Sequence, residues 1–116
     1  MCGIAGLLGI PWHLQTSAAN AMGAALAHRG PDDSGIWRSN PERSHTCTLV
    51  HRRLSIQDLS SAGHQPMASA CGRWQLVFNG EIYNQHDLRR NLERQGHRFR
   101  SSSDTEVLLQ LLIHDG

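Results

Sequence analysis

The second residue of the chain is a cysteine, and this position gives it a chemistry that an internal cysteine lacks. If Met1 is removed, Cys2 carries a thiol and a free α-amine on one carbon. The amine has a pKa of about 7.7–8.0 and a thiol one near about 8.5, so the amine can act as a base for its own side chain. Cys2 is therefore a candidate nucleophile, and the alternative is a small buried thiol at the start of a strand.

The segment FNGEIYN contains the groups that such a nucleophile would need. A thiol that attacks an amide carbonyl creates an oxyanion, which must be stabilised by preorganised hydrogen-bond donors. The Asn79 side chain and the Gly80 backbone N–H are such donors, and Glu81 places a carboxylate beside them. The alternative is a two-residue hairpin turn, because Asn-Gly is a preferred sequence for that turn.

Three further charged residues are candidates for binding or support. Arg53, at the end of a predicted strand in HRRLSIQDL, could bind a carboxylate or could be an exposed arginine on an edge strand. Asp104 in SSSDTEV lies in the first turn of a predicted helix, where it could bind a cation or only favour the helix dipole. We expect Arg29 in HRGPDDSG to be buried and to support the loops around Cys2.

The overall composition does not favour a nucleic acid or a membrane as a partner. The chain has 11 Lys plus Arg and 10 Asp plus Glu, which gives a net charge of +1. The apolar run from Gly3 to Ile10 lacks a basic leader, is broken by Pro11 and is too short to span a membrane. We therefore expect a cytoplasmic protein whose function depends on specific sites.

The cysteines and histidines do not form a recognisable disulfide or metal pattern. The three cysteines are widely spaced and odd in number, which suits a reducing compartment. His45, Cys47 and His51 would share one face of a strand and could in principle bind a metal, but no fourth ligand is suggested. We expect no metal.

The periodicity of apolar residues, together with capping and terminating residues, predicts both strands and helices. Strands are expected at residues 3–10, 45–56, 74–78 and 97–100. The predicted helices run from an N-cap at Ser17 to Gly30, over residues 85–95 after Asn84, and from Ser103 to the end of the chain. Tyr83 and Leu88 are placed as a hydrophobic staple, Gly96 as a terminator, and Ser103 and Glu106 as a capping box.

This order of elements favours an α+β fold, because strands and helices do not alternate as regular βαβ units. At 116 residues the chain is long enough for one domain or part of one.

Five motifs occur in series between residues 2 and 107: CGIAG, HRGPDDSG, HRRLSIQDL, FNGEIYN and SDTEV. Together they closely resemble the N-terminal glutaminase domain of class II glutamine amidotransferases, specifically that of glutamine-hydrolysing asparagine synthetases. The resemblance implies an N-terminal nucleophile (Ntn) hydrolase fold, an αββα sandwich of antiparallel sheets between helical layers. Residues 1–116 would be the first part of that domain, with its C-terminal portion and the synthetase domain absent.

The resemblance also implies a role for each motif residue. Cys2 would be the nucleophile, and the Asn79 side chain and Gly80 N–H would form the oxyanion hole. The α-carboxylate of glutamine would be bound by Arg53, with backbone groups of Leu54, Ser55, Ile56 and Gln57 lining that side. Glu81 and Asp104 would hold the α-ammonium group.

The implied activity is hydrolysis of L-glutamine to glutamate and ammonia through a γ-glutamyl thioester. The ammonia would pass to an ATP-activated carboxylate, that of aspartate, in the missing synthetase domain or subunit. This chain itself would need no cofactor, and ATP and Mg²⁺ would serve only the synthetase domain. The alternative is a truncated module that is not catalytic and has a structural or regulatory role, including that of a homodimer.

Overall fold

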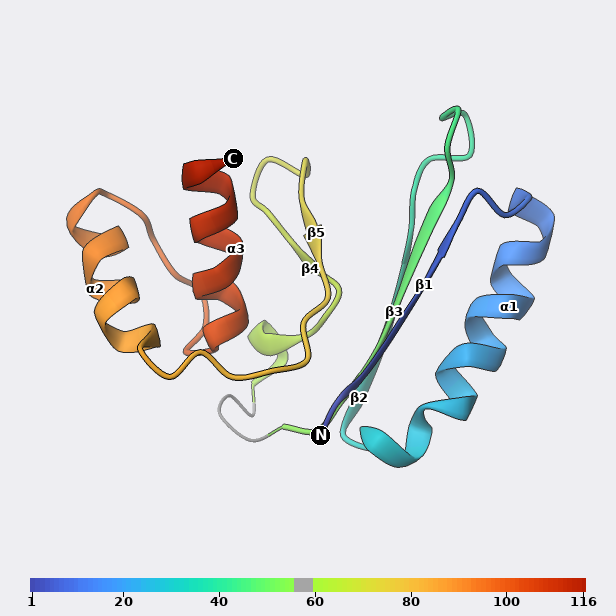
Figure 1. Cartoon of the computed structure of the whole chain (residues 1–116), viewed down its shortest axis with the longest axis horizontal. Coiled ribbons are helices and arrows are strands. Elements are labelled where there is room, and N and C mark those ends of the chain that lie inside the picture. The colour runs from blue at the N-terminus through green and yellow to red at the C-terminus, as the bar shows by residue number, and fades with distance from the viewer. Residues whose placement is uncertain (56–59) are drawn as a thin grey trace.

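The computed structural model describes residues 1–55 and 60–116, which form two antiparallel sheets and three α-helices (Figure 1). The first sheet contains β1 (Gly3–Leu8), β2 (Asp33–Arg38) and β3 (Cys47–Arg53), and the second contains β4 (Met67–Ala68) and β5 (Gln75–Leu76). The helices are α1 (Trp12–Ala25), α2 (Gln85–Arg94) and α3 (Asp104–Asp115), with short 3₁₀ helices η1 (Ala27–Arg29) and η2 (Ser61–Gly63). The expectation of mixed α and β structure with antiparallel sheets is confirmed.

The elements are arranged in layers. Helix α1 covers one face of the three-stranded sheet, and the β4–β5 hairpin and then α3 and α2 lie on the other side (Figure 1). The first half of the chain therefore builds one sheet and its covering helix, and the second half builds the opposite layers.

Strand β3 is the central strand of its sheet, and its pairing determines where Cys2 lies. The order is β1-β3-β2, and the antiparallel register pairs Gly3 of β1 with Arg52 of β3. Cys2 therefore lies at the end of β1 next to Arg53 and Leu54, although these residues are more than 50 positions apart in the sequence.

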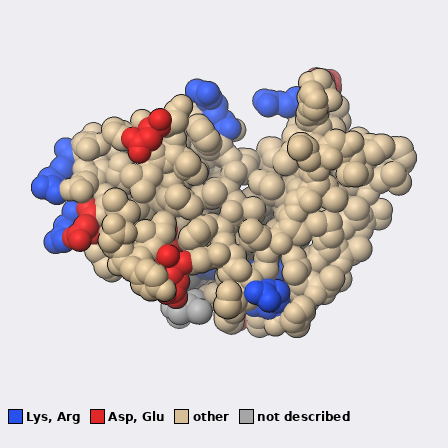
Figure 2. Space-filling model, viewed as in Figure 1, with Lys and Arg blue, Asp and Glu red and all other residues tan. Residues whose placement is uncertain are grey.

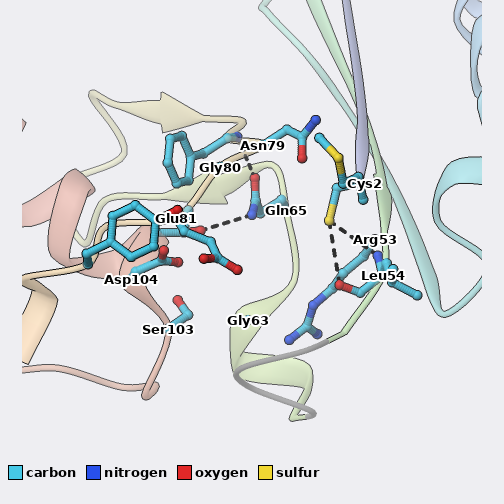
Figure 3. Close-up of a pocket in the computed structure, with 14 residues that line it drawn as sticks. Cys2, Arg53, Leu54, Gly63, Gln65, Asn79, Gly80, Glu81, Ser103 and Asp104 are labelled. Carbon is cyan, nitrogen blue, oxygen red and sulfur yellow. Dashed lines mark hydrogen bonds between the residues drawn. The ribbon is translucent and has the colours of Figure 1, made fainter.

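The predicted alternation along β3 is confirmed, because successive side chains of a strand point to opposite faces. Thr48 faces α1 and donates to Gln15 Oε1 at 2.6 Å, and Val50 packs near Gly23 of the same helix. His51 and Arg53 are both buried. Arg53 faces away from α1, toward the second half of the chain (Figure 3).

Helix α1 begins earlier than the sequence predicted. It starts at Trp12 directly after Pro11, and Ser17 lies inside the helix, where its hydroxyl donates to the Leu14 carbonyl at 3.2 Å. Pro11 explains the difference, because its fixed φ allows a helix to begin immediately behind it. The end of this helical region is as predicted, since η1 continues to Arg29.

The ends of α2 agree only in part with the predictions. Gly96 terminates the helix with a φ of +95°, a conformation that glycine adopts most readily, so the predicted terminator is confirmed. Asn84 precedes the helix, but its side chain makes no capping hydrogen bond. Tyr83 is 91% exposed, so the predicted staple with Leu88 is wrong.

Helix α3 is capped by Ser103, whose hydroxyl accepts a hydrogen bond from the Glu106 N–H at 3.3 Å. The second half of the predicted capping box is wrong. The Glu106 carboxylate accepts instead from the backbone N–H groups of Arg100 and Ser101. It thus fixes the loop that precedes the helix, and Val107 and Leu109 bury the apolar face.

The predicted strands at 3–10 and 45–56 are shortened to β1 and β3, and the other two predicted strands are reduced further or absent. Strand β5 contains only Gln75 and Leu76, and residues 97–100 form no strand. In each segment one backbone N–H is bound by a side chain instead of a neighbouring strand. Gln65 binds the N–H of Phe78, and Glu106 binds that of Arg100.

Candidate active site

A cavity of about 370 Å³ lies between the three-stranded sheet and the second half of the chain (Figure 3). Its walls bring together residues from the segment just before β1, from the end of β3, from η2 and the loop that follows it, from the segment after β5 and from the start of α3. Seven of the residues that the sequence singled out line this cavity: Cys2, Arg53, Leu54, Asn79, Gly80, Glu81 and Asp104.

The Cys2 sulfur is held by the backbone of Leu54. The thiol donates to the Leu54 carbonyl oxygen at 3.6 Å, and the Leu54 N–H donates to Sγ at 3.3 Å. The second of these contacts can persist when the sulfur is a thiolate. On the main-chain side, Arg29 Nε donates to the Cys2 carbonyl oxygen at 3.1 Å. Arg29 does not line the cavity, and it is half-buried, whereas the sequence predicted a buried residue.

Asn79 and Gly80 provide hydrogen-bond donors without partners. Neither the Asn79 carboxamide nor the Gly80 N–H has a hydrogen bond to any other residue in the described ranges 1–55 and 60–116. Figure 3 shows the Asn79 side chain extending toward Cys2. The hairpin alternative for these two residues is wrong, because β5 ends at Leu76 and pairs with β4, which precedes it.

Arg53 lies in the central strand of the sheet, so the alternative of an exposed edge-strand arginine is wrong. The residue is 8% exposed, and its Nη1 donates to the Ser60 carbonyl oxygen at 2.8 Å. The guanidinium packs directly on Gly63, where a Cβ atom would lie 2.3 Å from Nη2. The absence of a side chain at Gly63 therefore makes room for the guanidinium.

The two carboxylates lie on the wall opposite Cys2, as Figure 3 shows. Asp104 is 6% exposed, and its Oδ2 accepts a hydrogen bond from the Ile82 N–H at 2.9 Å. Glu81 is exposed. A carboxylate can accept more than one hydrogen bond, so Asp104 keeps acceptor capacity for a ligand.

The charges of this cavity match one kind of ligand. A buried guanidinium is suited to a carboxylate, and two carboxylates are suited to an ammonium group. The thiol and the unpaired amide donors could serve a carbonyl group held at a fixed distance from both.

An acid–base pair lies behind Arg53. His64 Nδ1 donates to Asp33 Oδ2 at 2.6 Å. Burial alone would raise the pKa of Asp33, but the hydrogen bond and charge of His64, with the Ser34 N–H and the charge of Arg53, hold it below its usual value. Asp33 therefore remains ionised beside the guanidinium.

His51 is 1% exposed, and neither of its ring nitrogens has a partner with hydrogen-bond geometry. Burial lowers the pKa of His51, and this effect outweighs the opposing influence of the Phe78 backbone. The ring is therefore uncharged at neutral pH.

Among the described residues, Ser55 is predicted to line the site but does not line the cavity. Its N–H donates to Asp32 Oδ2 at 2.8 Å. Ile56 and Gln57 fall outside the described residues. Apart from residues 56–59, the chain contains no group of three histidine, cysteine or acidic side chains arranged to hold a metal ion. Its described helices are all too short or too polar to cross a membrane.

Gly63 and Gln65 are among the wall residues that the sequence did not predict for the site. Both occur in the segment AGHQP, which carries no catalytic pattern. Gln65 is a buried polar side chain in a loop, and no sequence signal distinguishes it from an exposed loop glutamine. Gly63 could have been found only by knowing that Arg53 turns inward.

The fold and the cavity define a class that the sequence comparisons also identify. The profile of the glutamine amidotransferase domain family matches residues 1–116, and the chain belongs to this family.

The similar proteins are asparagine synthetases. The chain is 38% identical to asparagine synthetase [glutamine-hydrolyzing] 3 of Bacillus subtilis, over 97% of the chain and 18% of that protein. It is 37% identical to putative asparagine synthetase [glutamine-hydrolyzing] 2 of Methanocaldococcus jannaschii, over 96% of the chain and 24% of that protein. Against the asparagine synthetase of Sandersonia aurantiaca the identity is 38%, over 100% of the chain and 21% of that protein. The chain thus spans about a fifth of the length of these relatives.

Proposed function

We propose that this chain carries the glutaminase half-reaction of an asparagine synthetase-like enzyme, with L-glutamine as substrate. The observation that carries the proposal is the gathering of the Cys2 thiol, the unpaired donors of Asn79 and Gly80, and charges of both signs in one cavity. Membership of the amidotransferase family supports the same substrate.

Binding would fix the substrate at both of its α-substituents. Arg53 would bind the α-carboxylate, and Glu81 and Asp104 would bind the α-ammonium group. The side-chain amide of glutamine would then lie at a set distance from Cys2, which would favour glutamine over shorter amides.

The chemical step would begin with attack of the Cys2 thiolate on the carboxamide carbon. The resulting oxyanion would accept hydrogen bonds from the Asn79 side chain and the Gly80 N–H. Collapse would expel ammonia after protonation of the leaving nitrogen and leave a γ-glutamyl thioester. Water would then attack the thioester, which yields glutamate and regenerates the thiol.

The base for Cys2 would be its own α-amine, which requires removal of Met1. Met1 is 73% exposed in the structure, so its peptide bond is accessible to a processing enzyme. The intact mass of the active protein should therefore lack one methionine.

The complete protein would use the ammonia in a second unit. By analogy with the names of its relatives, we infer that a synthetase domain or subunit transfers ammonia to aspartate. Activation of that acceptor by ATP and Mg²⁺ would belong to the second unit. An Ntn-type αββα sandwich would explain the order of layers in Figure 1, and we propose that residues 1–116 form the N-terminal portion of such a domain.

A glutaminase assay tests the proposal. The chain should release glutamate from L-glutamine, and Cys2→Ala should abolish the release. Arg53→Ala should mainly raise the KM for glutamine, because it removes a contact made in both ground and transition states. A well-folded chain without Cys2-dependent hydrolysis would instead support the structural or regulatory module, in which case its state of association in solution becomes the informative measurement.

A further inference from the structure

The segment that carries the oxyanion donors has no regular structure of its own. Residues 79–81 belong to no helix or strand, and their backbone N–H groups bind no other residue in the described part of the chain. Something else must therefore hold the Asn79 and Gly80 donors in place relative to Cys2.

Two side chains hold this segment at its ends. Gln65 Oε1 accepts the N–H of Phe78 at 2.7 Å, and Asp104 Oδ2 accepts the N–H of Ile82 at 2.9 Å. Asp104 is already explained by its place in the substrate site. Gln65 has no role in the reaction as proposed, although it lines the same cavity and is 6% exposed.

The second end of the Gln65 side chain reaches α3. Its Nε2 donates to the Thr105 hydroxyl at 3.1 Å, and Thr105 follows Asp104 in the first turn of that helix. The Gln65 carboxamide thus joins the donor segment to the helix that carries the ammonium-binding carboxylate, as Figure 3 shows.

The backbone of Gln65 is fixed against the three-stranded sheet. A Cβ atom on Gly35 of β2 would lie 2.0 Å from the Gln65 carbonyl oxygen, so the two main chains are in direct contact. One residue therefore touches the sheet that carries Cys2 with its backbone and the donor segment with its side chain.

From these contacts we propose that Gln65 is a positioning residue that sets the place of the Asn79 and Gly80 donors relative to the Cys2 sulfur. The inference rests on the glutaminase function proposed above. Gln65 does not touch the reacting atoms, and it acts through the Phe78 backbone. Its loss would leave the substrate contacts of Arg53 and Glu81 in place while the donors shift.

Because Gln65 would position the oxyanion donors and not the substrate-binding groups, its loss should lower kcat and leave KM almost unchanged. Deletion of one oxyanion donor costs on the order of a hundredfold in kcat, and a misplaced donor should cost at least about tenfold. The KM for glutamine should stay within about twofold, because the groups that bind the substrate are unchanged.

The decisive variant is Gln65→Met, which keeps the volume of the side chain and removes both of its hydrogen bonds. Gln15→Met is a matched control. Gln15 is also buried and also joins two partners, donating to the Ile10 carbonyl oxygen at 2.7 Å and accepting from Thr48, but it lies on the α1 side of the sheet. The two variants should lose similar stability, and only Gln65→Met should lose kcat.

Two further measurements separate positioning from general damage. Alkylation of Cys2 by iodoacetamide forms no carbonyl oxyanion, so its rate, measured at Cys2 by mass spectrometry, should change by less than about twofold in Gln65→Met. Hydrogen exchange at the Phe78 amide should accelerate in Gln65→Met and not in Gln15→Met, because only the former loses the acceptor. If Gln65→Met does not fold, Thr105→Val removes the α3 end of the bridge and should show the same signature at smaller size.

Each outcome bears on the inference. An equal loss of kcat in Gln65→Met and Gln15→Met, or an unchanged kcat in Gln65→Met, would overturn it while leaving the glutaminase function intact. A change in KM alone would also overturn it. A wild-type chain without Cys2-dependent hydrolysis would reject the proposed function itself, and a slow iodoacetamide reaction in Gln65→Met would show that the thiol, and not the donors, had been disturbed.

Discussion

Gly63 leaves room for the Arg53 guanidinium, and this contact offers a test of the carboxylate subsite. In Gly63→Ala the new Cβ would lie 2.3 Å from Nη2, the far end of a flexible side chain, so the guanidinium must move while the fold can remain. We expect the KM for glutamine to rise by about tenfold, the loss of a single charge-assisted contact of about 1.4 kcal/mol. Steady-state kinetics measure this.

Gly23→Ala provides a control for that prediction. Gly23 lies within α1, and its added Cβ would meet Val50 at an ordinary contact distance of 3.5 Å. This variant should keep the wild-type KM and be slightly more stable, because alanine favours a helix over glycine. An unchanged KM in Gly63→Ala would remove Arg53 from the glutamine site.

The reactivity of Cys71 affects how a thiol-labelling experiment on Cys2 must be interpreted. Cys71 is exposed, and a hydrogen bond with the Ser69 hydroxyl is the main cause of its lowered pKa. Iodoacetamide should therefore react at Cys71 as well as at Cys2. Preference for Cys2 alone, which its role as nucleophile would suggest, is not a sufficient criterion in this chain.

Protection by the substrate is the better criterion. Saturating L-glutamine should slow the alkylation of Cys2 at least about tenfold, because bound substrate or thioester covers the sulfur, and should leave Cys71 unaffected. Peptide mapping after a short exposure to iodoacetamide gives both rates. Equal slowing at the two cysteines, or none at Cys2, would place glutamine elsewhere.

His51 should make the stability of the protein depend on pH. Its pKa in the folded state lies below the usual value of 6.5, so the unfolded chain binds a proton more readily than the folded one. Its contribution is fully present above about pH 6.5 and is lost as pH falls toward the folded-state pKa. The similar loss at Asp33 occurs only below the usual pKa of 3.8, so the two pH windows are separate.

Urea unfolding at pH 7 and pH 5 measures the effect. The free energy of unfolding should fall between these values by no more than about 1.4 kcal/mol per pH unit for one proton. His51→Leu should remove this part of the slope and should cost little at pH 7, because the ring nitrogens have no partners to lose. An identical slope in wild type and His51→Leu would assign the pH dependence to other groups.

At the scale of elements, Glu106 links the loop before α3 to the helix itself. The carboxylate is 2% exposed and accepts from the backbone of Arg100 at 2.8 Å and from the backbone and hydroxyl of Ser101 at 2.7 Å. Glu106→Ala leaves these donors unsatisfied and should lower the free energy of unfolding by about 2–4 kcal/mol. Denaturant melts test this.

Glutamine hydrolysis is a second readout for the same change. Asp104 lies next to the disturbed loop, so a folded Glu106→Ala variant should bind glutamine more weakly. Glu93→Ala on the exposed face of α2 is a suitable control and should change neither quantity. A loss of less than about 0.5 kcal/mol in Glu106→Ala would show that the loop is held by other contacts.

The elements that sequence patterns predicted well are those with a local cause. Gly96 ends α2 because its conformation suits glycine, and Ser103 caps α3 because its hydroxyl faces the first turn. The failures have non-local causes. The β5 strand is shortened where Gln65, 13 residues away, binds Phe78. The local pattern of apolar and polar residues cannot predict such a distant contact.

In the candidate site too, residues with a local chemical pattern were predictable and residues defined by distant contacts were not. Cys2, Asn79 and Gly80 could be proposed from their chemistry, because a thiol beside a free amine and an amide beside an unhindered N–H are visible in the sequence. Gly63 and Gln65 could not, since their importance depends on which side chains the fold turns toward them. Motif chemistry nominated the candidate reacting groups, and only the three-dimensional structure identified what holds them.

At the scale of the whole molecule, charge gives little guidance to a partner. On the face shown in Figure 2 the basic and acidic side chains are scattered, and no single sign covers the surface. This distribution agrees with the net charge of +1 and with a function that depends on the cavity between the layers.

The candidate site residues are divided between opposite layers of the fold. Cys2 and Arg53 come from the three-stranded sheet, whereas Asn79, Gly80 and Asp104 come from the opposite layers. Strand pairing and helix formation each occur within one half of the chain. The proposed site, in contrast, requires that the two halves pack against each other. Conditions that loosen the packing of one half on the other can therefore abolish turnover while secondary structure remains.

If the proposed glutaminase function is correct, activity should thus be lost before the chain unfolds. In a urea titration, the midpoint for loss of glutamine hydrolysis should lie below the midpoint of the far-ultraviolet circular dichroism signal. Coincident midpoints would mean that the layers and their interface melt as one cooperative unit. If activity is lost first, as expected, glutamine hydrolysis is a sensitive reporter of interface integrity, which spectroscopic probes of helix and strand content do not detect.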